Sequence, residues 1–141
     1  MQEFTIKGNQ GFIRMELQKA SDFLQNTNQC GGYDAEGIVE IKSGNYYVLG
    51  KTWFTTGEVY EFYKQLDHCY RNLKGKAIFW NYEASLKIEV IFYQLGQVVL
   101  KGYYKEQAYL DNELLFEIES DQTFLPPTIE ELKRFVEHYG H

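Results

Sequence analysis

The sequence LKIEVIFYQLGQVVLKGYYK at residues 86–105 is the clearest indication of the fold class. Every second residue over 86–92 is apolar, whereas Lys87 and Glu89 lie between them. Such period-two alternation is typical of a strand with one buried face. The turn Gln94-Leu95-Gly96 leads at once into a second apolar run, and a connection this short joins only antiparallel neighbours. The sequence therefore predicts antiparallel sheet.

The same pattern on either side of this hairpin predicts further strands. The tetrapeptide Gly8-Asn9-Gln10-Gly11 and the tripeptide Ser43-Gly44-Asn45 are strong turn signals between apolar runs. Residues 21–32 are polar and are expected to form a loop. The expected strands span residues 3–7, 12–19, 33–42, 46–52, 76–82, 85–94, 97–105 and 113–120.

Two helices are expected, one between the fourth and fifth strands and one at the C-terminus. Thr55 with Glu58 forms a capping-box pattern, and apolar residues then recur at spacings of three and four until Gly75. Thr128 with Glu131 predicts a second capping box behind a Pro-Pro pair. The expected helices span residues 57–73 and 128–139.

These elements predict one α+β domain over residues 1–141, with about eight mostly antiparallel strands. We expect the two principal helices to pack on one face of a curved sheet. The pattern leaves open a closed barrel with a ligand cavity inside. The residues expected in the core are Phe62, Leu66, Ile88, Val90, Phe116 and Leu132.

The chain is acidic, with 20 Asp and Glu against 14 Lys and Arg and a formal net charge of −6. A field of this sign repels phosphate backbones and anionic lipid, and attracts a basic partner. We therefore expect no direct nucleic-acid or membrane binding. No apolar run approaches the ~18 residues of a membrane span, and no signal-type segment is seen. The expected location is the cytoplasm; the pattern says nothing about oligomeric state.

The sequence offers few residues for catalysis or metal binding. Cys30 and Cys69 lack metal-site spacing, and we interpret both as reduced thiols. The histidines are His68, His138 and His141, none of them in a ligand or nucleophile pattern. Phosphate-loop, dinucleotide and serine-hydrolase motifs are missing. We expect no catalytic residue, no metal ligand and no cofactor, and hence not an enzyme.

The one enzyme-like feature is an acidic stripe, Glu117, Glu119 and Asp121, at alternate positions of the last expected strand. Alternate strand residues share a face, and Phe116 and Ile118 would fill the other face. The first interpretation is an ordinary solvated face, the second a surface that binds a protein, and the third a catalytic or metal-binding set.

A second acidic set, Asp34, Glu36 and Glu40, follows the glycines at the start of the third expected strand. Gly37 interrupts it and suggests a bulge. Ordinary surface and partner contact both explain this set. With the stripe, it supplies the candidate partner-binding residues.

From about residue 33 onward the chain resembles the WapI-like family of bacterial immunity proteins. The resemblance lies in an ordered series: Thr56-Gly57 opening an aromatic helix that ends Leu73-Lys74-Gly75, then Asn81-Tyr82-Glu83-Ala84-Ser85-Leu86, a turn at Gly96, and Phe116-Glu117-Ile118-Glu119-Ser120-Asp121-Gln122-Thr123 before the last helix. These features cover about three-quarters of the chain, and residues 1–32 carry none of them.

The resemblance implies a protein that binds and neutralises a cognate toxin domain, often a nuclease. Occlusion of a basic substrate surface would be the mechanism, with an acidic inhibitor steered to it. Two alternatives stay open. A small-molecule-binding barrel would use the aromatic residues as cavity lining, and a hydrolase would use the acidic strand face.

Overall fold

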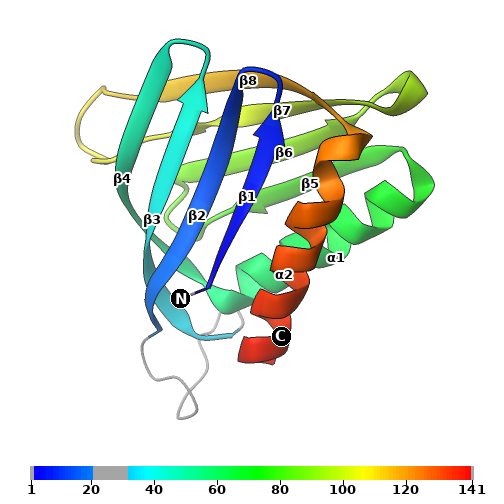
Figure 1. Cartoon of the computed structure of the whole chain (residues 1–141). Helices are drawn as coiled ribbons and strands as arrows, with labels where there is room; N and C mark the ends of the chain where they lie inside the picture. The colour runs from blue at the N-terminus through cyan, green and yellow to red at the C-terminus, as the bar shows by residue number, and fades with distance from the viewer. Residues whose placement is uncertain (1, 21–31, 141) are drawn as a thin grey trace.

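The computed structural model describes residues 2–20 and 32–140 of the chain (Figure 1). Within these residues the chain forms eight strands and two principal helices, which confirms the predicted α+β class. The elements are β1 (Glu3–Gly8), β2 (Gly11–Ala20), β3 (Asp34–Ser43), β4 (Tyr46–Thr55), α1 (Thr56–Asn72), β5 (Gly75–Trp80), β6 (Leu86–Phe92), β7 (Gln97–Tyr104), β8 (Leu114–Asp121) and α2 (Leu125–Tyr139), with short 3₁₀ turns at Gln94–Gly96 and Gln122–Phe124.

The strands form two sheets of four rather than one continuous sheet. The first has the order β1-β2-β3-β4 and the second β5-β6-β7-β8, with antiparallel neighbours throughout. Figure 1 shows the first sheet in front of the second, with its strands crossing those behind. No ladder among the described residues joins the two sheets, so they do not close into a barrel. The barrel alternative from the sequence is therefore not the observed architecture.

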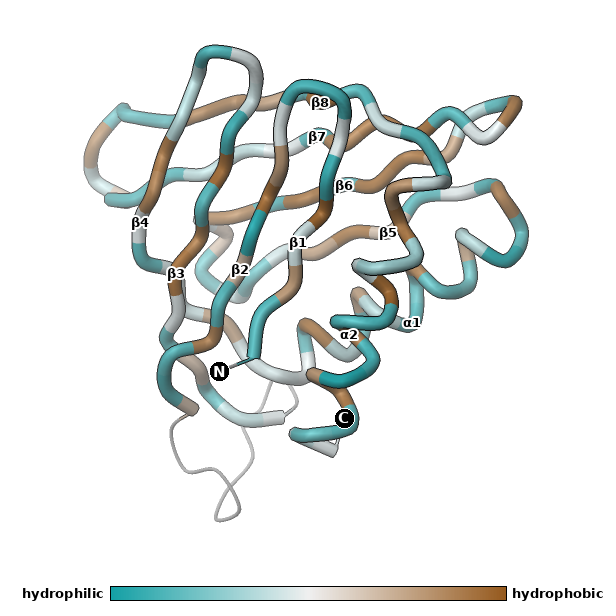
Figure 2. The backbone as a smooth tube through the Cα atoms, in the orientation of Figure 1, coloured by the Kyte–Doolittle hydropathy of each residue, from teal (hydrophilic) through white to brown (hydrophobic). Residues whose placement is uncertain are grey.

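The core lies between the two sheets, where apolar residues of both inner faces meet. Buried and partly exposed residues alternate along β3 and β6, as the period-two pattern predicted, and Figure 2 shows hydrophobic residues interrupted by hydrophilic ones along β2. All six residues expected in the core are buried. Phe62 of α1 lies between the sheets, with ring centroids 6.1 Å from Phe4 of β1 and 6.0 Å from Phe79 of β5. The core is thus shared by both sheets and by α1.

The helices pack along sheet edges, and this corrects the expectation that they cover one face. α1 packs on β5 and α2 on β1, each the outermost strand of its sheet. The reason is that the apolar face of each sheet is already covered by the other sheet. What remains for the helices is the open side between β1 and β5, which they close (Figure 1).

Side chains of both helices also satisfy the free backbone of these edge strands. The Thr128 hydroxyl donates to the Thr5 carbonyl at 2.6 Å, and the Thr5 N–H donates to Glu131 Oε1 at 3.0 Å. On the other edge, the Ile78 N–H donates to Gln65 Oε1 at 2.9 Å. Covering an edge strand with a helix is one way in which proteins keep it from pairing with another chain.

The predicted start of α2 is wrong, because Thr128 and Glu131 do not cap their own helix. Their side chains form hydrogen bonds with the backbone of β1. α2 begins at Leu125, and its two prolines lie in the first turn, where backbone N–H groups have no partner within the helix anyway. The predicted capping box of α1 is confirmed. Thr55 accepts from the Glu58 N–H at 3.1 Å, and Glu58 accepts from the Thr55 N–H at 2.7 Å.

Cys69 is a free, buried thiol, and burial raises its pKa. Cys30 lies outside the described residues. In the part of the chain that the structure describes, no helix is long and apolar enough to cross a membrane. The same part holds no group of three or more His, Cys, Asp or Glu residues placed to bind a metal ion.

Candidate partner-binding surfaces

The acidic stripe lies on β8, the outermost strand of the second sheet. Glu117 and Glu119 are exposed on the outer face, whereas Phe116 and Ile118 point into the core and are buried. The alternation of the sequence thus places these carboxylates as predicted. Asp121 behaves differently, because it accepts hydrogen bonds from the backbone and hydroxyl of Thr123 and so caps the following 3₁₀ turn.

The backbone edge of β8 is met by the hairpin turns of the first sheet. The Asn9 N–H donates to the Glu119 carbonyl at 2.8 Å, and the Ser43 hydroxyl donates to the Glu117 carbonyl at 3.3 Å. β8 therefore lies across the ends of the β1–β2 and β3–β4 hairpins, and its carboxylates are held on a fixed strand.

A hollow of about 530 Å³ opens where β8 meets these turns. Its lining includes Tyr46, Leu115, Glu117 and Glu119, and no lysine or arginine is among its described lining residues. Tyr46 is 70% exposed and Leu115 71% exposed. Glu117 makes a long ion pair with Lys101, at 3.9 Å between two exposed side chains. Such a pair contributes little and leaves the carboxylate available.

The second acidic set lies on the other sheet. Asp34, Glu36 and Glu40 are at alternate positions of β3 and lie partly exposed on its outer face. Glu36 approaches Lys51 at 3.9 Å. Because the two sets belong to different sheets and face away from the shared core, they do not form one continuous stripe.

The bulge suggested at Gly37 occurs on the neighbouring strand. The register between β2 and β3 shifts between Leu17 and Lys19, opposite Gly37 and Glu36. A Cβ atom at position 37 would collide with the Glu16 carbonyl. Gly37 therefore allows β2 and β3 to approach closely next to the bulge.

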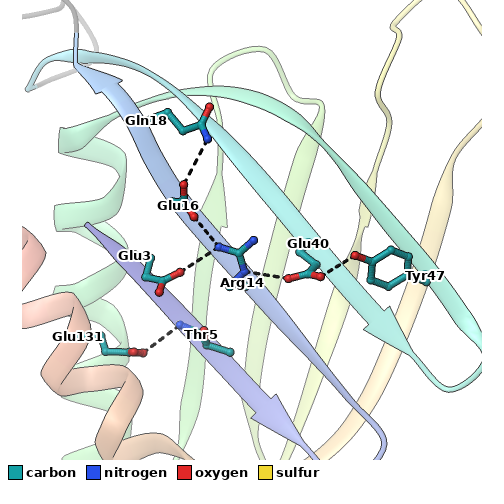
Figure 3. Close-up of polar contacts among 8 residues, drawn as sticks. All are labelled: Glu3, Thr5, Arg14, Glu16, Gln18, Glu40, Tyr47 and Glu131. Atoms are coloured by element: carbon teal, nitrogen blue, oxygen red, sulfur yellow. Dashed lines mark hydrogen bonds and ion pairs between the residues drawn. The ribbon is translucent and has the colours of Figure 1, made fainter. Parts of the chain in front are cut away.

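Glu40 is held in a network centred on Arg14, on the outer face of the first sheet (Figure 3). The Arg14 guanidinium forms ion pairs with Glu3 at 2.9 Å, Glu16 at 2.8 Å and Glu40 at 2.8 Å. Glu40 also accepts a hydrogen bond of 2.6 Å from the Tyr47 hydroxyl. Three carboxylates around one guanidinium form a mutually oriented cluster on an open sheet face.

The pKa values follow from these contacts. Hydrogen bonds from Tyr47 and then Arg14 lower the pKa of Glu40, and the hydrogen bond from Arg14 lowers the pKa of Glu16. The hydrogen bond to Glu40 raises the pKa of Tyr47. An ionised Glu40 and a protonated Tyr47 are thus favoured together, and the hydrogen bond between them orients the Tyr47 side chain on β4.

The structure adds residues that the sequence reasoning missed. A second hollow of about 330 Å³ is also lined by Tyr46 and includes Glu106 and Glu113 of the β7–β8 connection. A sequence signal existed, since residues 106–132 contain no lysine or arginine. Their carboxylates are Glu106, Asp111, Glu113, Glu117, Glu119, Asp121, Glu130 and Glu131.

Taken together, the fold and its surfaces define a compact α+β scaffold with acidic, aromatic surface hollows. The sequence model of the family described as Immunity protein WapI-like family matches residues 4–140. The chain belongs to this family, and the match includes residues 4–32, which carry none of the features on which the resemblance rests. No curated protein matches the chain in sequence.

Proposed function

We propose that this chain is an immunity protein that binds one copy of a cognate toxin domain and covers its substrate surface. Membership of the immunity family supports a toxin protein as partner. We further propose that the toxin domain is basic and acts as a nuclease, so that its neutralisation needs no catalysis by this chain. We also propose that the chain acts in the cytoplasm, where such a toxin would meet nucleic acid.

The observation that carries the proposal is the uneven charge of the chain. Eight of its 20 carboxylates fall in residues 106–132, which have no cation, and four of these eight line the two hollows beside Tyr46. A nuclease presents positive charge to hold phosphates. An acidic surface is therefore steered to the same region of the toxin, with association faster than between neutral surfaces.

Of the six carboxylates expected from sequence to bind the partner, Glu117 and Glu119 are the favoured pair. They are exposed beside Tyr46 and Leu115, which can supply apolar contact area at the centre of an interface. Glu40 is already bound to Arg14 and Tyr47, and Asp121 caps a turn. Asp34 and Glu36 lie on β3 of the first sheet, so they would take part only if the contact extended from β8 onto that other sheet.

The test is co-expression of this chain with the toxin domain encoded by the neighbouring gene, scored by survival of the host. Wild-type chain should protect, and an empty vector should not. The purified pair should elute as a 1:1 complex and lose activity on nucleic acid. Death of cells that express both proteins would refute the immunity role, whereas protection without a 1:1 complex would refute occlusion.

A further inference from the structure

Most of the outermost strands of the two sheets have contacts along their free edges, but part of the edge of β4 is open. Helix side chains cover β1 and β5, and the hairpin turns meet β8. The fourth outermost strand is β4, whose ten residues run from Tyr46 to Thr55. An uncovered strand edge offers unpaired N–H and C=O groups to another chain.

The two-residue turn before β4 determines which of its groups face outward. Ser43 pairs with Tyr46 across this turn, so the backbone of alternate residues, beginning at Tyr47, points away from β3. In the second half of β4 these groups have partners. The Lys51 carbonyl accepts from the Tyr104 hydroxyl at 2.6 Å, and the Trp53 carbonyl accepts from Asn81 Nδ2 at 3.0 Å.

Gly50 marks the boundary between the covered and the open half of β4. The Tyr104 ring lies against this glycine, and a Cβ atom there would collide with the Tyr104 hydroxyl. Before Gly50, the outward N–H and C=O groups of Tyr47 and Leu49 have no hydrogen-bond partner within residues 2–20 and 32–140. Three side chains of this half-strand are well exposed: Tyr46 at 70%, Tyr47 at 56% and Leu49 at 54%.

The hollow of about 330 Å³ runs beside this open half. Tyr46, Tyr47 and Val48 of β4 form one side, and the β7–β8 connection forms the other with Glu106 and Glu113. No lysine or arginine is among the described residues that line it. A chain lying here would meet unpaired backbone, tyrosine rings and two carboxylates.

We infer that the partner adds an extended segment to β4 along Tyr47–Leu49, with a lysine or arginine of that segment next to Glu106 and Glu113. This inference rests on the proposed function and assigns the binding mode. Main-chain hydrogen bonds to the edge supply affinity, and the carboxylates select a basic segment. Tyr47 is already oriented by Glu40, so less side-chain freedom is lost on binding. A second copy of this chain fits less well, because it brings the same carboxylates beside its own β4.

Hydrogen exchange on the wild-type chain tests the backbone contact directly, with the toxin domain encoded by the neighbouring gene as the probe. The amides of Tyr47 and Leu49 should exchange at least tenfold more slowly in the complex. Binding that leaves both amides unprotected would overturn this inference and leave the immunity role intact. A wild-type chain that does not bind the toxin domain at all would contradict the immunity role and this inference together.

Substitution of Leu49 gives an independent test. Leu49→Pro removes an outward N–H without removing a bond to β3, so the fold should survive, as circular dichroism would check. It should weaken toxin binding at least a hundredfold. Leu49→Ala keeps the N–H and should weaken it less than tenfold. Leu95→Ala removes a 99%-exposed side chain at the opposite end of β7 and should leave Kd unchanged.

Two results with the substituted chains would also overturn the inference. The first is equal weakening by Leu49→Pro and Leu49→Ala, which would place the contact in the side chain. The second is a wild-type homodimer that Leu49→Pro dissociates, which would make a second copy the occupant of the edge. If the proline variant does not fold, the exchange measurement on the wild-type chain decides alone.

Discussion

Two buried threonines show how one hydroxyl can oppose or support folding. Thr52 and Thr128 are each 1% exposed. The Thr128 hydroxyl donates to the Thr5 carbonyl, whereas the Thr52 hydroxyl has no hydrogen-bond partner among the described residues. An unsatisfied buried hydroxyl carries an uncompensated desolvation cost.

The same substitution at these two positions should therefore act with opposite sign. Thr52→Val removes the unsatisfied hydroxyl and should raise the free energy of unfolding by about 1 kcal/mol. Thr128→Val leaves the Thr5 carbonyl without its donor and should lower it by about 1–2 kcal/mol. Urea unfolding measures both changes. Effects of equal sign would show that a partner for Thr52 exists or that the Thr128 bond contributes nothing.

The Arg14 cluster should make stability depend on pH on the acid side. The pKa values of Glu16 and Glu40 are lowered in the folded chain, so their contribution is present above the unfolded pKa of about 4.3 and is lost as pH falls through the folded values. Arg14→Gln should raise both folded pKa values, measured by carboxyl NMR titration. It should also make the free energy of unfolding fall less steeply as pH is lowered below about 4.3. Unchanged titration of Glu40 would show that Tyr47 alone sets its pKa.

The capping box of α1 contains a carboxylate, Glu58, on which two effects act in opposite directions. Glu58 accepts the Thr55 N–H, yet burial raises its pKa because the charged form loses water. Its ionisation therefore opposes folding as pH rises through the folded pKa, while its hydrogen bond favours folding.

Two substitutions of Glu58 should separate these effects. Glu58→Gln keeps the side-chain acceptor and removes the charge, so at pH 7 the free energy of unfolding should stay equal or rise, by less than about 1 kcal/mol. Glu58→Ala removes the acceptor and should lower it by about 1 kcal/mol. Thermal unfolding at pH 4 and pH 7 checks both. If Glu58→Gln and Glu58→Ala lower the free energy of unfolding equally, the hydrogen bond from the Thr55 N–H to the side chain at position 58 contributes nothing measurable to stability.

Most elements could be predicted from sequence because their signals are local. Alternation defined the strands, and spacings of three and four defined α1. The start of α2 could not be predicted, since Thr128 and Glu131 form the same local pattern whether they cap a helix or bind a neighbouring strand. Nor could the division into two sheets, because α1 separates β4 from β5 and no local pattern states whether they pair.

The candidate surfaces were predictable only in part, for a related reason. Glu117 and Glu119 were found because strand alternation places them on one face. Glu106, Glu113 and Tyr46 come from a connection and a strand end, which come together only once β8 crosses the hairpins. The open half of β4 was also hidden, because it depends on where Tyr104 and Asn81 end their coverage of the edge.

The partner could be directed by the net charge of the chain or by the placement of its carboxylates. The formal charge of −6 acts over the entire surface, but charges farther apart than about 10 Å are largely screened at 0.1 M salt. Steering by the region around Tyr46 therefore requires carboxylates in that region. Glu130 and Glu137, exposed on α2 and not among the described lining residues of either hollow beside Tyr46, offer a comparison at equal charge.

The double reversal Glu117→Lys/Glu119→Lys should slow association with the toxin domain by at least tenfold at low salt and flatten the salt dependence of its rate. Glu130→Lys/Glu137→Lys changes the net charge equally, by +4, and should slow association far less, because these positions lie on the helix that packs on β1. Stopped-flow mixing between about 0.02 and 0.5 M salt separates the two, with circular dichroism confirming that both variants fold. Equal slowing by the two variants would mean that net charge alone steers the encounter. Slowing by the helix variant alone would place the interface on α2 instead of at β8.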